Sequence, residues 1–404
     1  MFAFAVLVST GCNNIETKTE NNTQPIPGFY NIQQEDSNLM TLFLCGDVMT
    51  GRGIDQVLPF AGDPALYESY MKSAKGYVEL AESVNGSIPK PVDFSYIWGD
   101  ALEVLEKIKP DLRIINLETS VTKSNDYWKG KPVHYRIHPD NIPCLTAAKI
   151  DICALANNHV LDWGYEGLTE TMETLKNANI NISGAGYNLT EAEAPMVMSI
   201  NEKGRVIVFS FGSTTSGVPF NWAADKDKPG VNLLWNFSNE TILKIKEQVI
   251  SLKGQNAVVI ASVHWGSNWG YNIPAELQHF AHQLIDEAGV DIIHGHSSHH
   301  PRPIEVYKNK LILYGCGDFI NDYEGIGGYE KYRDDLTLMY FVNVNPSNGN
   351  LIKLRMVPMQ IKKFRLNYAS GKDTEWLRDV LNKESENFKT QFELGEDNTL
   401  FIKW

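Results

Sequence analysis

Seven short apolar runs, each stopping at a polar side chain, constrain the fold of this chain more than any other feature. The runs are MTLFLCGD, DLRIINLE, IDICALANNH, GRVIVFSFGSTTS, NAVVIASVHWG, VDIIHGHSSHH and KLILYGCGDFIND, all after residue 39. Runs this apolar are typical of strands that are buried on both faces. Segments with helical periodicity lie between several of them, for example at 165–178 and 275–288. Strands that alternate with helices predict an α/β fold.

The polar residues that end these runs suggest one shared site. In open α/β sheets ligands bind outside the carboxyl ends of the strands, so we expect these side chains to converge on one crevice. Oxygen and imidazole donors suit Mn, Zn or Fe, and roughly six or seven of them are needed to hold two neighbouring ions. The sequence therefore predicts a site for one or two divalent metal ions, to which the run ends contribute Asp47, Glu118, Asn158, His159, His264, His296 and His299.

The charge balance limits the classes of partner. The chain has 36 Lys and Arg against 49 Asp and Glu, a net charge of −13. General nucleic-acid binding needs a positive surface and is not expected. An anionic substrate remains compatible with the charge, because a bound metal ion inverts the field inside a cleft.

The first residues differ in composition from the rest of the chain. Residues 1–12, MFAFAVLVSTGC, have the order of a signal peptide, and Gly11-Cys12 resembles the lipobox of a bacterial lipoprotein. No Lys or Arg precedes the apolar run and Ser9 stands where Leu is usual, so an ordinary apolar terminus is the alternative. Residues 13–38 are polar and aperiodic, as expected of a flexible linker. We expect a cell-envelope protein, secreted or held at the membrane only through Cys12, since no later stretch is apolar enough to span a bilayer.

Together the motifs resemble the CapA family of bacterial capsule or poly-γ-glutamate biosynthesis proteins, whose domain is related to the calcineurin-like metallophosphoesterases. The matching pieces are CGDVMTGRGID (45–55), INLETSVT (115–122), the segment 135–168 that contains ALANNH, GAG (184–186), VHWGSNW (263–269) and GHSSHHPRPIEVYKNKLILYGCGDFI (295–320). The resemblance implies a four-layer α/β/β/α sandwich, which we expect over residues 39–365. Residues 366–404, whose charged segment suggests an amphipathic helix, are expected to form a helical tail packed on that domain.

The resemblance also implies a role for each matching residue. Asp47 would bind the first metal, and Glu118 takes the place of the bridging carboxylate. His159 would protonate the leaving group or steady the transition state. The remaining implied ligands are Asn158, and for the second metal His264 and His296, with His299 completing the shell. A helix N-cap for Asp47 and an ordinary loop carboxylate for Glu118 are the simpler alternatives.

Two departures from the phosphoesterase pattern matter. Phosphoesterases of this type carry Asp-x-His in the first motif, whereas this chain has Asp47-Val48-Met49, so one ligand of the first metal is absent. Their last motif is Gly-His-x-His, whereas here Gly295-His296 is followed by His299 three residues later. Both changes put metal occupancy and phosphoesterase chemistry in question.

Five further residues are expected beside the ligands. Asp162 is placed to orient His159, while His294 and Asp318 are expected to support ligand histidines by hydrogen bonds. Arg52 and Arg136 are candidate anion contacts, because a guanidinium grips carboxylate or phosphate with two parallel hydrogen bonds.

Two functions follow as hypotheses. The first is a metal-dependent hydrolase in which an activated water attacks a phosphoester or an amide of an anionic polymer, poly-γ-glutamate being the substrate associated with the family. The alternative is a non-catalytic, metal-containing component of a capsule assembly or export machine, with capsule-synthesis membrane proteins as partners. The ligand set favours the enzyme, and the missing first-motif histidine favours the alternative. A phosphatase unrelated to capsules is a third possibility.

Overall fold

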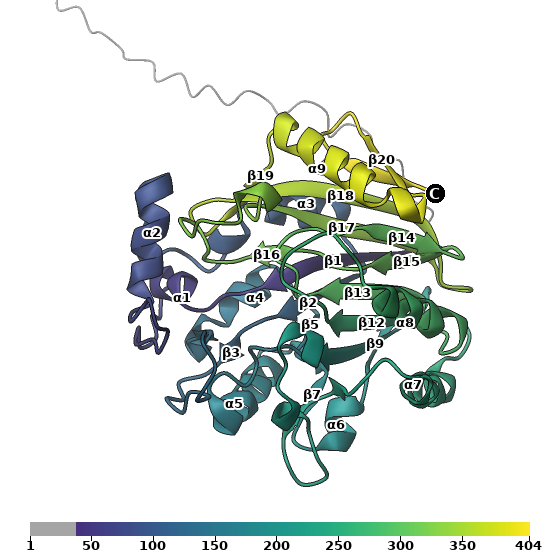
Figure 1. The fold of residues 1–404 in the computed structure, drawn as a ribbon, viewed down its shortest axis with the longest axis horizontal. Coiled ribbons are helices and arrows are strands. Elements are labelled where there is room, and N and C mark those ends of the chain that lie inside the picture. The colour runs from purple at the N-terminus through teal and green to yellow at the C-terminus, as the bar shows by residue number, and fades with distance from the viewer. Residues whose placement is uncertain (1–37) are drawn as a thin grey trace, which may run out of the picture.

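The computed structural model describes residues 38–404 as a mixed α/β structure built on two large sheets (Figure 1). The signal segment 1–12 with Cys12, and nearly all of the predicted linker 13–38, lie outside the described residues. Within residues 38–404, no helix is long and apolar enough to cross a bilayer. The α/β class predicted from the alternating runs is confirmed.

The larger sheet has ten strands and joins a parallel half to an antiparallel half. The parallel half is formed by β1 (Met40–Val48), β2 (Leu112–Leu117), β5 (Ile152–Ala154), β6 (Asn181–Ser183) and the short β16 (Asp318–Ile320) beside β1. The antiparallel half is formed by β17 (Leu336–Asn345), β18 (Asn350–Ile361), β19 (Leu366–Tyr368), β20 (Gln391–Leu394) and β21 (Leu400–Lys403).

The smaller sheet has seven strands and is mostly parallel. Its order is β11 (Leu233–Leu234), β9 (Gly204–Ser213), β12 (Ala257–His264), β13 (Ile292–His296), β15 (Lys310–Leu313) and β14 (Ile304–Tyr307), with β8 (Met196–Ile200) antiparallel to β9. Two short pairs, β3 (Ser120–Val121) with β4 (Arg136–Ile137) and β7 (Ala185–Gly186) with β10 (Gly230–Val231), complete the strands of the described chain.

Three apolar cores hold the elements together. One lies between the two sheets, where side chains of β1 and β2 meet those of β9, β12 and β13. A second joins the larger sheet to helices that include α3 (Ala101–Ile108) and α5 (Gly164–Asn177). A third joins the smaller sheet to α7 (Asn239–Leu252) and α8 (Ala275–Asp286). The remaining helices are α1 (Gly53–Val57), α2 (Lys75–Asn85), α4 (Pro143–Ala147), α6 (Leu189–Glu193) and α9 (Gly371–Glu384).

The helices α5 and α8 occupy the stretches whose periodicity predicted them. Both bury one face, with Leu168, Met172 and Leu175 on α5 and Leu277, Phe280 and Leu284 on α8 among the buried side chains. This is the arrangement expected of an amphipathic helix on a sheet.

The segment 366–404 corrects the expectation of a helical tail. It contains α9, but it also supplies β19, β20 and β21 to the larger sheet, and β19 pairs with β18 across the predicted boundary at residue 365. The strands QFEL and LFIK are only four residues long each, which is too short for a strand pattern to stand out beside a charged helix.

Candidate metal centre

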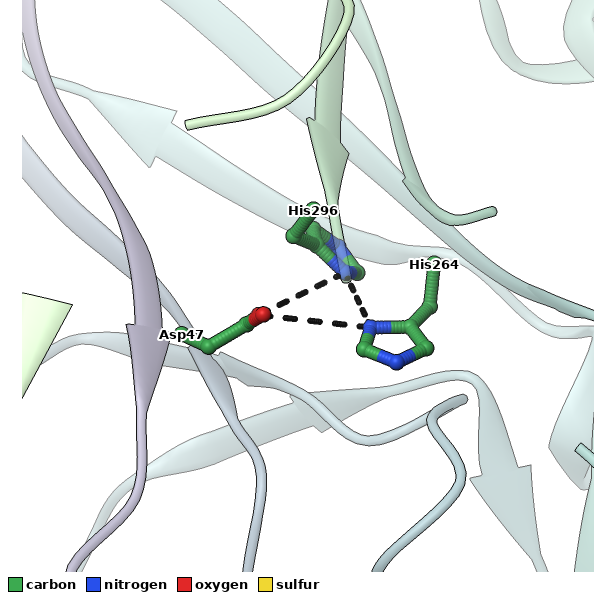
Figure 2. Close-up of side chains that lie close together, drawn as sticks. All are labelled: Asp47, His264 and His296. Carbon is green, nitrogen blue, oxygen red and sulfur yellow. Dashed lines mark hydrogen bonds and ion pairs between the residues drawn. The ribbon is translucent and has the colours of Figure 1, made fainter. Parts of the chain in front are cut away.

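Two sets of buried side chains gather at the carboxyl ends of the central strands. Asp47, His264 and His296 form the imidazole set, and Asp47, Glu118 and Asp318 form the carboxylate set. In each set the ligand atoms all lie within 4.8 Å of one another. Figure 2 draws the imidazole set, with the Asp47 carboxylate directed toward both rings. Because Asp47 belongs to both sets, the two candidate ion positions are adjacent.

Strand register brings these residues together. β12 pairs with β13 so that His264 lies opposite His296, and β16 pairs with β1 so that Asp318 lies opposite Asp47. The approach of β16 to β1 requires glycine at position 46, because a Cβ there would lie 1.7 Å from the carbonyl oxygen of Gly317. Within each sheet, polar ends of runs far apart in the sequence therefore meet because their strands are hydrogen-bonded neighbours, and packing of the two sheets brings Asp47 to the two histidines.

The two imidazoles of the imidazole set face the same point. Their Nδ1 atoms lie 2.8 Å apart, and each is 3.9 Å from Asp47 Oδ1. Burial lowers the pKa of His264 and His296 well below the ordinary histidine value, which favours the neutral form that binds metals. The Oδ1 atom of Asn158 lies 3.0 Å from the other ring nitrogen of His264, so an amide oxygen is also at hand.

A second layer of hydrogen bonds fixes His296. The Ser262 hydroxyl lies 2.9 Å from His296 Nε2 and 3.1 Å from His294 Nδ1, and His294 Nε2 lies 2.6 Å from the carbonyl oxygen of Cys45. His294 therefore supports a candidate ligand through Ser262, at the position expected of it. Such outer contacts hold a ligand ring in one orientation.

The carboxylate set concentrates negative charge in a buried place. Burial and the neighbouring Asp318 raise the pKa of Asp47 to about 7, although Asn116 Nδ2 (2.7 Å) and the Ser297 amide (3.0 Å) donate hydrogen bonds to it. Burial, with Asp47 and Asp318 nearby, raises the pKa of Glu118 well above its ordinary value. Buried like charges are unfavourable unless a cation compensates them. The donor set and this uncompensated charge both fit a divalent metal ion, with Mn, Zn and Fe as candidates.

His159 stands beside the carboxylate set. Its Nε2 lies 3.8 Å from Glu118 Oε1, and its Nδ1 lies 2.6 Å from Asp162 Oδ2. The ring of Tyr135 stacks on the imidazole at 3.8 Å between ring centres, and the Tyr135 amide donates to the same Asp162 oxygen at 2.7 Å. The structure thus places Asp162 where it orients His159, as the sequence suggested.

Lys131 was missed by the sequence reasoning. Its Nζ donates to the Asn158 carbonyl oxygen and to Asp162 Oδ1, and lies 3.2 Å from His159 Nδ1. Burial lowers the pKa of Lys131, and Asp162 opposes that effect. The residue lies in an irregular loop with no periodic pattern, so spacing and periodicity gave no signal for it.

His299 and Asp318 exchange the roles expected of them. His299 Nδ1 lies 2.9 Å from Asp318 Oδ1, and His299 Nε2 is bound by the Asn268 amide group at 2.7 Å. With both ring nitrogens engaged, His299 joins neither ligand set. Asp318 instead belongs to the carboxylate set. Met49, which stands where the phosphoesterase pattern has histidine, is buried. The ending GCGD of its run, like CGD at 45–47, was the available signal.

The two arginines differ in position. Arg52 lines the cavity above the ligand sets, but its guanidinium is paired with Asp322 (2.5 Å) and Glu68 (3.1 Å). The structure does not bring Arg136 to that cavity, which corrects the expected anion contact. Its guanidinium is held by carbonyl oxygens of Ser124 (2.7 Å) and Asp63 (2.9 Å) and packs on the Trp163 ring at 3.8 Å.

A cavity of about 490 Å³ opens above the two sets. Carboxylate, imidazole and amide groups from Glu118, Asn158 and His159 line its inner part. The buried Tyr135, stacked on His159, also lines it. The other aromatic side chains of the lining, contributed by connecting segments, are Tyr70, Trp269, Tyr323 and Tyr329. A ligand can therefore reach a buried, charged floor through a partly aromatic opening.

Comparison with known proteins identifies the family. The family described as bacterial capsule synthesis protein PGA_cap matches residues 41–323, and the chain belongs to that family.

Individual relatives extend the likeness over most of the chain. A Mycobacterium tuberculosis protein named probable polyglutamine synthesis accessory protein is 49% identical over 367 residues, which cover 90% of this chain and 96% of the relative. The PGA biosynthesis protein CapA of Bacillus subtilis is 30% identical over 316 residues, covering 78% of this chain and 70% of the relative. The capsule biosynthesis protein CapA of Bacillus anthracis is 25% identical over 333 residues, covering 82% and 70%.

Proposed function

We propose that this protein serves the synthesis of a poly-γ-glutamate-type capsule polymer as a metal-dependent hydrolase of the CapA type, acting on a phosphoester or an amide. One apolar core lies between the two sheets, and a further core joins each sheet to helices. This order of layers supports the finer proposal of a four-layer sandwich of the metallophosphoesterase type. The names of its relatives in Mycobacterium and Bacillus support the polymer class.

One observation carries the hydrolase proposal: two ligand sets share Asp47 beneath an open cavity. Asp47, His264 and His296 would hold one ion, with the Asn158 oxygen beside them. Glu118 and Asp318 would complete the other position. A bound divalent cation would lower the pKa of a water molecule and polarise the bond to be cleaved.

The protein's own contribution would centre on His159. Asp162 accepts the hydrogen bond from Nδ1, which leaves Nε2 as the atom that faces Glu118 and the cavity. Burial lowers the pKa of His159, so the ring is neutral at pH 7 and Nε2 can take a proton from the attacking water. The same atom would then pass that proton to the leaving oxygen or nitrogen. Tyr135 keeps the ring in place by stacking on it, and Lys131 donates a hydrogen bond to Asp162, the acceptor of the His159 Nδ1 proton.

A second candidate function is a non-catalytic metal-containing component of the polymer assembly machine. The buried Met49 favours it, because one ligand of the phosphoesterase pattern is missing there. The word accessory in the names of the mycobacterial relatives also favours it. Under either function, we propose a cell-envelope location with a lipid anchor at Cys12, for which the sequence of residues 1–12 is the support.

Metal content and turnover measured together test the proposal. The purified protein is analysed for bound metal, then assayed on a generic phosphodiester and on poly-γ-glutamate with and without Mn²⁺ or Zn²⁺. Hydrolysis that disappears in His159→Ala, with the metal retained, is the expected result. Bound metal without turnover on either substrate would favour the non-catalytic function. Failure to bind any divalent metal would contradict both.

A further inference from the structure

The outer wall of the cavity carries aromatic rings on one side. Trp269 and Tyr329 lie flat against each other, with ring centres 3.8 Å apart and planes 4° from parallel. Tyr323 lies edge-on to His299 at 5.3 Å between ring centres, and all three aromatic residues line the cavity. Aromatic faces are electron-rich and attract cations, most strongly when water is partly excluded.

Asp334 adds a negative charge to the same wall. It lines the cavity, and within residues 38–404 its carboxylate forms no ion pair, whereas the adjacent Asp335 is paired with Arg333 at 2.7 Å. Burial and the nearby Asp318 raise the pKa of Asp334 to about 6, so a positive charge at this point would be stabilised.

The basic groups of the lining are already neutralised. Arg52 is paired with Asp322 and Glu68, Lys131 with Asp162, and His299 with Asp318. At the rim, away from the candidate metal positions of the floor, a polyanion would therefore meet an unpaired carboxylate and no unpaired basic side chain from the described lining. A ligand with one positive group is better matched to this wall.

We propose that Asp334, together with Trp269, Tyr323 and Tyr329, binds a primary ammonium group of the substrate. The substrate would then enter by the amino end of a peptide-like chain, which carries such a group, and not by its polyanionic interior. The identity of the substrate polymer rests on the proposed function. The ammonium site itself requires only that the protein binds the amino end, whether or not it hydrolyses the polymer. The carboxylate would bind the ammonium group directly, and the aromatic side chains that line the same cavity would contribute the parts of their rings that the Trp269–Tyr329 stack leaves open.

A matched pair of ligands tests the site. γ-Glutamylglutamate and its N-acetyl derivative differ in the ammonium group, and their binding to the purified protein is measured by calorimetry at pH 7. We expect the free amine to bind about tenfold more tightly, as for one charge-assisted hydrogen bond. In Asp334→Asn the preference falls below about twofold. In Trp269→Leu, which keeps the carboxylate, it weakens by about two- to fivefold.

The neighbouring Asp335→Asn is the matched control and keeps the preference, because its carboxylate is committed to Arg333. Equal binding of the two ligands, no binding of either, or a preference that survives Asp334→Asn overturns the proposal. Loss of bound metal in Asp334→Asn would assign the carboxylate to the metal centre and would also overturn it. A protein that prefers the amine but hydrolyses nothing contradicts the proposed catalysis and leaves the ammonium site standing.

Discussion

The floor of the cavity and its rim are made by different kinds of backbone. The floor consists of Asp47, Glu118, Asn158, His264, His296 and Asp318, which lie within or just after central strands. The rim consists of Arg52, Lys131, Trp269, Tyr329 and Asp334, which lie in connecting segments. The register of the strands positions the side chains of the floor, so the candidate ligands are already close together without a bound ligand. Apart from Asp334, the rim residues are held by side-chain pairs such as Arg52 with Asp322 and Trp269 with Tyr329, so each of these depends on a particular partner.

The largest effect is expected at Asp47, the residue that both ligand sets share. Asp47→Ala removes a ligand from each candidate ion position and should lower divalent-metal affinity by at least about 100-fold, with hydrolysis lost alongside it. Calorimetric titration with Mn²⁺ or Zn²⁺ measures the change. The buried Asp55, which accepts hydrogen bonds from neutral groups and belongs to neither set, provides the control Asp55→Asn. Unchanged metal binding in Asp47→Ala would show that neither candidate ion position depends on Asp47, and would contradict the proposed metal centre.

A smaller effect, of a different kind, is expected at Lys131. Lys131→Met removes the cation that holds Asp162 and the Asn158 carbonyl oxygen, so turnover should fall about 10- to 100-fold while metal binding is kept. The proton position on His159, read by nitrogen NMR of labelled histidine, should become mixed between Nδ1 and Nε2. Lys129→Met, an exposed lysine of the same loop, is the matched control. Lys131→Arg should recover part of the turnover, and a variant that loses metal together with turnover would show that Lys131 supports the floor instead.

The substitution Glu118→Gln should have opposite effects on the stability of the metal-free protein and on its affinity for metal. The pKa of Glu118 is raised in the folded protein, so its ionised form destabilises the metal-free fold above the unfolded pKa. Glu118→Gln should therefore stabilise the EDTA-treated protein by about 1–2 kcal/mol at pH 7, with the gain vanishing near pH 4. The same change should weaken metal binding. Chemical denaturation at the two pH values measures this, with the exposed Glu166→Gln as the control. If Glu118→Gln instead lowered the stability of the metal-free protein at pH 7, the ionised carboxylate of Glu118 would not destabilise the fold, contrary to the prediction.

The same contrast explains how much the sequence could predict. Asp47, His264 and His296 were found because an apolar run that stops at a polar residue reveals a strand end, and strand ends of parallel sheets meet. His299 and Asp318 were assigned each other's role, because the register of β16 against β1 is a tertiary fact that spacing does not contain. Lys131 and Asp334 carry no periodic signal at all, since loops are positioned by contacts that form only in the fold.

The smallest effect is expected at Arg136, where a substitution should change the stability of the protein but not its catalysis. Arg136→Lys keeps the charge but loses the planar packing on Trp163 and the fork of hydrogen bonds to Ser124 and Asp63, so stability should fall by about 1 kcal/mol. Because the guanidinium does not line the cavity, turnover of the folded variant and its KM should stay within about twofold of the parent. A raised KM with unchanged stability would instead support the anion contact first expected of Arg136, and would add this residue to the rim of the cavity.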